Sequence, residues 1–177
     1  MSEQPRTHAV STSGGTLAAS EFTSSALRNR LRVELDAPVS QVWELLGDLS
    51  RFPEYSEGLE RVETKHDEHG RCTEYTCYFK PLEEGSEGPV SRDVMKWYEP
   101  ERGYLSVERE GDAGTLGAVA FMTLNPIPTG THLTYDMHYD AEDLETMKAN
   151  LDEVNVDMAD KLIARFGGRV TERYVEP

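Results

Sequence analysis

The stretch Leu35–Leu46, LDAPVSQVWELL, followed by Asp48–Tyr55, DLSRFPEY, decides the fold. Pro38 suits the first turn of a helix, because its ring fixes φ and its missing N–H has no partner at that position. Apolar residues then recur at helical spacing: Val39, Val42, Trp43, Leu45 and Leu46. Gly47 breaks the run, and the next segment predicts a second short helix that stops near Pro53.

One strand precedes these helices and a run of strands follows them. Leu31, Val33 and Leu35 alternate with polar neighbours, which is the pattern of a half-buried strand. After residue 55, alternating segments are separated by turn signals at regular spacing, as in an antiparallel meander. The predicted strands are 59–64, 71–80, 90–98, 104–109, 118–124 and 131–139, with a loop at 81–89.

The final segment changes its period from two to about 3.6. Apolar residues recur every three or four positions: Leu144, Met147, Leu151, Val154, Met158, Leu162 and Phe166. This predicts a long amphipathic helix that ends at Gly167-Gly168. Strands grouped between helices, without alternation of strand and helix, indicate an α+β domain with an antiparallel sheet.

Size and charge narrow the function. The 177 residues suffice for one domain with a sizeable core. The net charge of −15 argues against binding of nucleic acid and docking on anionic membranes. Because no apolar run is long enough to span a bilayer and the N-terminus lacks a secretory signal, a cytoplasmic location without stable membrane insertion is expected.

Composition also divides the chain. Residues 1–27, rich in Ser, Thr, Gly and Ala, are predicted to be a flexible tail, residues 28–168 the domain, and residues 169–177 a C-terminal tail.

Cys72 and Cys77 lie five apart in a predicted strand, so they should point to opposite faces and form no disulfide. Two cysteines cannot build a four-ligand zinc site, and neither a metal nor a cofactor is expected.

Five short motifs carry a family resemblance: Ala37-Pro38, Val42-Trp43, Asp48 with Phe52-Pro53, the turn Tyr98-Glu99-Pro100, and Gly130-Thr131. Together with the order of elements, they resemble the START/polyketide cyclase (SRPBCC) superfamily over roughly residues 29–167. The resemblance implies a helix-grip fold, in which a curved antiparallel sheet of six to seven strands wraps around the C-terminal helix and leaves an internal cavity. Members bind lipids, hormones or polyketides, and some catalyse aromatic ring closure and dehydration.

Asn155 is a polar residue on the apolar face of the predicted helix. A buried amide without partners costs about 1–3 kcal/mol, so it should bond either to the sheet backbone or a buried water, or to a hydroxyl or carbonyl of a ligand. Tyrosine suits a ligand cavity because it joins an apolar body to one polar tip. The remaining candidates for the cavity lining, which could equally be ordinary core, are Tyr75, Tyr98, Tyr135, Met137, Leu151 and Met158.

Arg92 alternates with Val94 and Tyr98, so the three should share a strand face. An inward Arg92 could anchor a carbonyl or carboxylate, whereas an outward one would be solvated. Aromatase/cyclase members of the superfamily carry a Ser and an Arg spaced two apart on a comparable strand. Here Ser91 and Arg92 are adjacent and only one can point inward, so that mechanism is not carried over.

Three functions follow as hypotheses. The first is binding or carrying of an apolar small molecule (a lipid, polyketide or aromatic compound) in the internal cavity. The second is a polyketide cyclase or dehydratase, in which Arg92 with Tyr98 or Tyr75 would polarise a carbonyl and Asn155 would orient the substrate. The third is a protein interaction module, which would present an exposed apolar patch.

Overall fold

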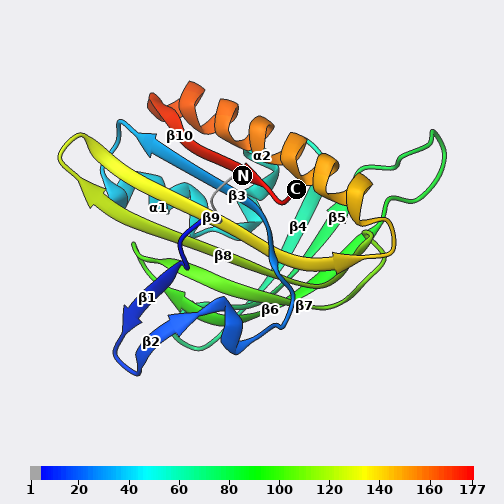
Figure 1. Cartoon of the computed structure of the whole chain (residues 1–177), viewed down its shortest axis with the longest axis horizontal. Coiled ribbons are helices and arrows are strands. Elements are labelled where there is room, and N and C mark those ends of the chain that lie inside the picture. The colour runs from blue at the N-terminus through cyan, green and yellow to red at the C-terminus, as the bar shows by residue number, and fades with distance from the viewer. Residues whose placement is uncertain (1–4) are drawn as a thin grey trace.

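An eight-stranded antiparallel sheet wraps around a long helix in the computed structural model, which describes residues 5–177 (Figure 1). The strand order is β10-β3-β9-β8-β7-β6-β5-β4, and β1 and β2 form a separate hairpin. The elements are β1 (Ala9–Thr12), β2 (Gly15–Ala18), a 3₁₀ helix (Ala19–Glu21), β3 (Leu27–Leu35), α1 (Val39–Leu46), a second 3₁₀ helix (Leu49–Glu54), β4 (Leu59–His66), β5 (Cys72–Phe79), β6 (Val90–Glu99), β7 (Gly103–Gly111), β8 (Thr115–Ile127), β9 (Gly130–Ala141), α2 (Leu144–Phe166) and β10 (Gly168–Val175).

Every helix and strand predicted between residues 31 and 166 is present, and the α+β helix-grip architecture is confirmed. The second short helix is a 3₁₀ helix that contains Pro53. Asp48 caps its N-terminus, and the Asp48 carboxylate accepts a hydrogen bond from the Ser50 amide. The carboxylate of Asp143 caps α2 by accepting the Thr146 amide at 3.1 Å. Helix α2 packs against β3, β9 and β10.

Both ends of the chain are more regular than their composition predicted. In place of a tail, the segment before residue 27 contains the β1–β2 hairpin, while residues 1–4 lie outside the described residues. The other end contains β10, which pairs with β3 and adds the eighth strand to the six or seven expected. Neither segment carries a strong hydrophobic period, because each is stabilised by contacts with distant parts of the chain.

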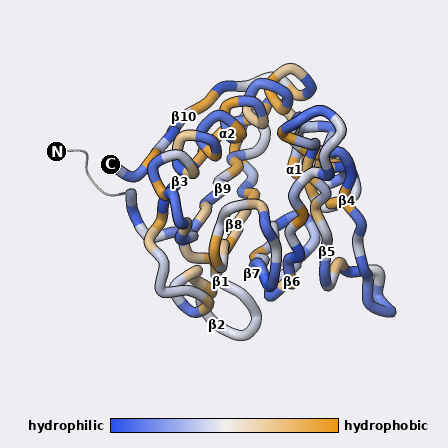
Figure 2. Tube along the Cα trace, turned by 90° about the vertical axis from the view of Figure 1, so that its right-hand side faces the viewer, coloured by the Kyte–Doolittle hydropathy of each residue, from blue (hydrophilic) through white to orange (hydrophobic). Residues whose placement is uncertain are grey.

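The main core lies between the concave face of the sheet and the helices. In Figure 2 the strands run from β10 on one side to β4 on the other, with α2 and α1 above them and the hairpin below. The fully buried members of the main core include Leu31, Val33, Leu35, Val42, Leu49 and Leu162. No helix among residues 5–177 is long and apolar enough to cross a membrane.

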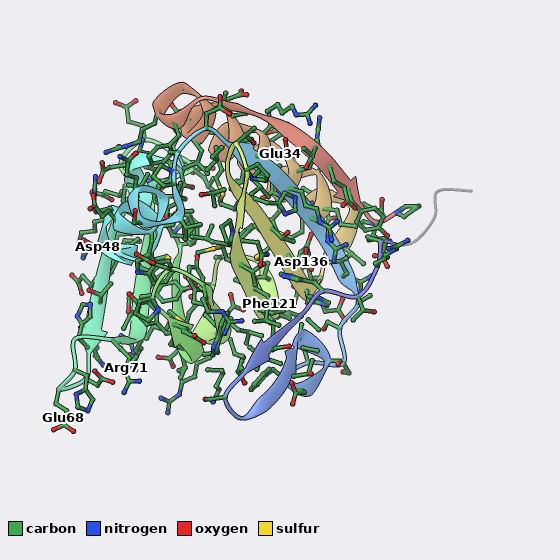
Figure 3. All side chains as sticks on the ribbon, turned by 90° about the vertical axis from the view of Figure 1, so that its left-hand side faces the viewer. Glu34, Asp48, Glu68, Arg71, Phe121 and Asp136 are labelled. Atoms are coloured by element: carbon green, nitrogen blue, oxygen red, sulfur yellow. The ribbon has the colours of Figure 1, made fainter. Side chains whose placement is uncertain are left out.

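A second, smaller core lies on the opposite face of the sheet, beneath the hairpin. Ala19, Leu105, Val119 and Phe121 are buried there, and the partly buried residues packed on them are Val10, Leu17, Phe22, Trp97 and Val107. His8 stacks on Phe121 with ring centroids 4.2 Å apart. Figure 3 shows Phe121 and Asp136 on the side of the sheet that the N-terminal segment crosses. The hairpin is therefore a cover for the outer face.

The two cysteines correct one expectation from simple alternation. Cys72 and Cys77 are both free and both buried in the main core, so they lie on the same face. The pairing of β4 with β5 shifts between Cys72 and Glu74, which marks a bulge. One extra residue at a bulge reverses the faces that an odd spacing would give.

Candidate functional site

A row of three polar side chains crosses the middle of the concave face. Tyr75 on β5 pairs directly with Asp93 on β6, and Asp93 pairs directly with Glu108 on β7. Directly opposed side chains in an antiparallel pair have their Cβ atoms about 4.5–5.5 Å apart. The register therefore places two carboxyl groups side by side on β6 and β7.

Two irregularities in the β6–β7 pairing set these directions. The register shifts between Arg92 and Asp93 and again between Met95 and Trp97. Ser91 and Asp93 are buried and Arg92 between them is exposed, as simple alternation gives, while the first shift adds Arg109 to β7 and brings Glu108 opposite Asp93. After the second shift, Trp97 joins the outer core and Tyr98 the inner one.

Asp93 has little to stabilise a negative charge. Ser91 donates a hydrogen bond to the Asp93 carboxylate at 3.3 Å, and no ion pair to Asp93 occurs among residues 5–177. Burial, followed by the charge of Glu108, raises the pKa of Asp93 to about 7. A carboxyl group in this state can hold or release a proton near neutral pH.

Glu108 is held in place by donors from β8. The Thr115 hydroxyl donates to the Glu108 carboxylate at 2.7 Å. Burial raises the pKa of Glu108, and the bonds from Thr115 and the amides of Ala118 and Gly117 oppose that rise. Of the two acids, Glu108 is thus the one with more support for its charge.

Four buried tyrosines lie on the inner face, and three of them are close to Asp93. The hydroxyls of Tyr75 and Ser106 are hydrogen-bonded at 2.7 Å, both fully enclosed. The hydroxyl of Tyr55 is buried without a hydrogen-bond partner, near Tyr135 and Tyr104. Burial raises the pKa of each of these phenols, so all are neutral hydrogen-bonding groups. An orphaned buried hydroxyl requires an explanation, and an absent ligand or water provides one.

The central residues keep some accessible surface although they lie under the helix. Ser91, Asp93, Ala120 and Tyr135 are 6–8% exposed, against 0–1% for Leu31, Val33 and Leu133 on neighbouring strands. These four side chains are therefore slightly less completely enclosed than the core residues of β3.

A hollow of about 360 Å³ opens at one end of this face. It lies between the turn that joins β7 to β8 and the first turn of α2, and its lining residues are Gly111, Asp112, Gly114, Thr115, Leu116, Glu142, Asp143, Thr146 and Met147. Thr115 contributes to this hollow and also donates to Glu108. Thr115 is therefore the residue of this hollow that contacts Glu108.

A second hollow, of about 460 Å³, lies at the other end of β6. Trp43, Asp48, His66 and Tyr98 contribute to its lining, together with neighbouring residues of α1 and β4. The Tyr98 hydroxyl donates to the carbonyl oxygen of Gly47 at 2.8 Å. The Tyr98 hydroxyl is therefore already hydrogen-bonded within the protein.

Most of the residues expected to line a cavity lie on the inner side. Asn155 and Met158 of α2 are buried, and Leu151 is half-buried. On the sheet, Tyr75 and Tyr135 are buried in the main core, and Met137 and Tyr98 pack against it. Tyr75 and Tyr135 lie beside Asp93, whereas Tyr98 lies toward the second hollow.

Arg92 is the exception. It is exposed on the outer surface and forms an ion pair with Glu110 of β7 at 2.6 Å. Arg92 and Tyr98 do not share a face, because Lys96 is the extra residue at the second bulge. The cyclase mechanism that required an inward Arg92 therefore fails.

The sequence reasoning missed Asp93, Glu108 and Tyr55. Ser91 and Asp93 alternate on the opposite phase of the strand from Arg92, and this phase was available as a signal. The cross-strand pairing of Asp93 with Glu108 could not be predicted from the sequence, because it depends on a strand register that includes two bulges.

The family comparison covers most of the chain. The family model described as "Polyketide cyclase / dehydrase and lipid transport" matches residues 26–175. No curated protein matches the chain in sequence.

Solved structures with the same fold share little sequence identity with this chain. A START superfamily protein from Mycobacterium smegmatis is 14% identical with a TM-score of 0.66, over 78% of this chain and 97% of that one. The protein XoxI from Bacillus cereus is 12% identical with a TM-score of 0.63, over 79% and 96%. An aromatase/cyclase, Zhui, from a Streptomyces species is 17% identical with a TM-score of 0.60, over 79% and 93%. With the family model matching from residue 26 to residue 175, the chain belongs to the polyketide cyclase / dehydrase and lipid transport family.

Proposed function

We propose that the protein binds an apolar small molecule between α2 and the concave face of the sheet. The observation that carries this proposal is the buried Tyr55 hydroxyl without a partner, close to inner-face residues that retain accessible surface. Apolar walls with a few convergent polar groups are typical of small-molecule sites. The family description, which includes lipid transport, supports the same function.

The hollow beside the first turn of α2 supplies the entrance in this proposal. Met147 and Thr115 lie on its two sides, and a Cβ atom added at Gly114 would come within 2.5 Å of the Met147 methyl. In this proposal a ligand that enters beside Thr115 next contacts Glu108, because the Thr115 hydroxyl is hydrogen-bonded to the Glu108 carboxylate. The turn between β7 and β8 would have to separate from α2 to admit a bulky molecule.

Native mass spectrometry of the purified protein, followed by denaturing extraction, tests the proposal. We expect an additional mass that is lost on denaturation and whose occupancy falls in Tyr135→Ala, because that change removes an inner wall. Arg92→Ala is the matched control, since Arg92 lies on the outer face and should leave occupancy unchanged. A protein that arrives empty and takes up no aromatic probe would contradict the proposal.

A second candidate, a cyclase or dehydratase, is favoured by one observation. Asp93 is a carboxyl group on the inner face whose pKa is raised to about 7, mainly by burial and then by Glu108. A general acid or base works best with a pKa near the operating pH. Turnover of an aromatic poly-β-ketone that is lost in Asp93→Asn, while binding is retained, would establish it. Turnover unaffected by Asp93→Asn would remove this candidate.

An interaction module has less support. The large apolar side chains that are exposed among residues 5–177 are Leu82, Leu116 and Val170. They belong to the 81–89 loop, β8 and β10, so they are scattered over separate elements. Single exposed apolar residues are normal on a protein surface.

A further inference from the structure

The polar part of the inner face carries negative charge without a compensating cation. Asp93 and Glu108 are cross-strand partners, and neither forms an ion pair with any residue that the structure describes. The nearby arginine of β6, Arg92, points outward to Glu110. The buried lysine of α2, Lys148, is engaged by Glu145 at 2.7 Å and by the carbonyl oxygen of Pro177.

Two opposed carboxyl groups in a partly desolvated site cannot both stay ionised at low cost. The charge of Glu108 is supported by the hydrogen bond from Thr115 at 2.7 Å, and the nearby amides of Gly117 and Ala118 also lower its pKa. Asp93 has the single bond from Ser91 at 3.3 Å, so Asp93 is the group that holds the proton. The pair then offers one O–H donor and one carboxylate acceptor, with a net negative charge.

An independent feature of the same inner face points to a ligand. The Tyr55 hydroxyl is buried without a partner, and it lies near Tyr104 and Tyr135, both of which lie near Asp93. A ligand that reaches Tyr55 from the entrance beside Thr115 passes the carboxyl pair. Phenol side chains on this route suit a flat aromatic body.

The charge of the pair decides what the ligand can carry. A carboxylate or phosphate group would bring further negative charge into a site of low dielectric without a cation to meet it. A purely apolar ligand would leave the carboxyl groups desolvated without new hydrogen bonds. A neutral hydroxyl avoids both costs, because it can donate to Glu108 and accept from Asp93.

We propose that Asp93 and Glu108 act as a charge filter, which admits neutral ligands with hydroxyl groups on an aromatic body and rejects carboxylate-bearing lipids and aromatic acids of the same size. This inference rests on the proposed function and deepens it by naming the ligand class. In this proposal Asp93 and Glu108 contact the polar end of the ligand. They set selectivity by repelling a ligand carboxylate as well as by hydrogen-bonding a ligand hydroxyl.

Three probes of nearly equal shape test the filter: 2-naphthol, 2-naphthoate and 2-methylnaphthalene. Their affinities are measured at neutral pH by calorimetry or by their own fluorescence. We expect 2-naphthol to bind at least tenfold more tightly than 2-naphthoate, with 2-methylnaphthalene between them.

The variant Glu108→Gln removes the charge of the pair and keeps its shape. It is expected to lower the ratio of naphthol to naphthoate affinity by tenfold or more, chiefly by improving naphthoate binding, which mere loss of structure would not do. Asp93→Asn replaces the protonated member and leaves the charge of Glu108 in place, so it should keep the discrimination against 2-naphthoate. Glu110→Gln is the matched control, since Glu110 lies on the same strand and faces outward. Its affinity ratio should equal that of the unmodified protein.

Three results overturn the filter. If 2-naphthoate binds as tightly as 2-naphthol, or if Glu108→Gln leaves the ratio unchanged, the filter is wrong while the proposed binding function stands. If none of the three probes binds, the proposed function and the filter both fail.

Discussion

Arg30 and Asp136 are direct partners on the adjacent strands β3 and β9, and they form a two-pronged ion pair on the outer face of the sheet. The Nε–Oδ1 and Nη2–Oδ2 distances are 2.7 and 2.8 Å, and both side chains are buried. Burial alone would raise the pKa of Asp136, but the hydrogen bonds from Arg30 and then His8 hold it below its usual value. The outer face thus contains a buried pair of opposite charges, whereas the inner face contains two carboxyl groups side by side without a cation among the described residues.

Asp136→Asn should strongly destabilise the fold. The change leaves the buried Arg30 guanidinium without its counter-charge, which typically costs about 3–5 kcal/mol. Chemical denaturation followed by circular dichroism measures the loss. Glu110→Gln breaks the exposed pair with Arg92 and should cost no more than about 1 kcal/mol. Equal losses in the two variants would show that the outer pair is not buried in solution.

His8→Ala should loosen the N-terminal cover. The His8 Nε2 atom lies 2.7 Å from the Thr123 hydroxyl, and its ring stacks on Phe121. Removing the ring leaves the buried Thr123 hydroxyl unpaired, at a cost of about 1–3 kcal/mol. Limited proteolysis before residue 27 and the thermal midpoint report the change. His69→Ala, in an exposed turn, is the control and should have no effect on either.

Asp93→Asn should change how stability depends on pH. The folded pKa of Asp93 is about 7, above the ordinary value of 3.8, so between these values the folded state binds more protons than the unfolded state. The stability of the unmodified protein therefore falls as pH rises from about 4 to about 7 and levels off above that.

The variant lacks this loss. Relative to the unmodified protein, it should gain on the order of 1–3 kcal/mol between pH 5 and pH 8, measured by chemical denaturation at both values. The exposed residue Asp140 provides the matched control, and Asp140→Asn should follow the unmodified protein. Parallel pH profiles for Asp93→Asn and the unmodified protein would mean that Asp93 is ionised in the folded state throughout.

Neither cysteine should react with an aromatic disulfide reagent in the folded protein. Burial raises the pKa of Cys72 to about 11 and that of Cys77 further still, so the nucleophilic thiolate is scarce at neutral pH. Two thiols per chain should react once denaturant is added. Rapid labelling of one thiol under native conditions would reveal an open path to the inner face.

Most of the fold follows from periodicity, because its elements carry strong local patterns. The apolar repeat of α2 and the motifs around Pro38 and Pro53 locate the helices within a few residues. Strands β1, β2 and β10 are the exceptions, since short segments that depend on tertiary partners leave no clear period.

The site was less predictable than the fold. Asn155 could be placed inside from its position on a helix wheel, and it is buried. Arg92 was expected to share a face with Tyr98, and it does not, because one extra residue, Lys96, changes the phase of β6 before Tyr98. Bulges arise from the geometry of two paired strands, so the alternation of one strand does not reveal them.

Strand β8 is buried on both faces, with Ala120, Met122 and Leu124 toward α2 and Val119 and Phe121 toward the hairpin. Adjacent residues of this strand therefore pack into two different cores. If the inner face binds a ligand as proposed, substitutions at Ala120 or Met122 would reshape the space for that ligand while Val119 and Phe121 keep the strand anchored. The N-terminal cover would then let the inner face change without loss of the scaffold.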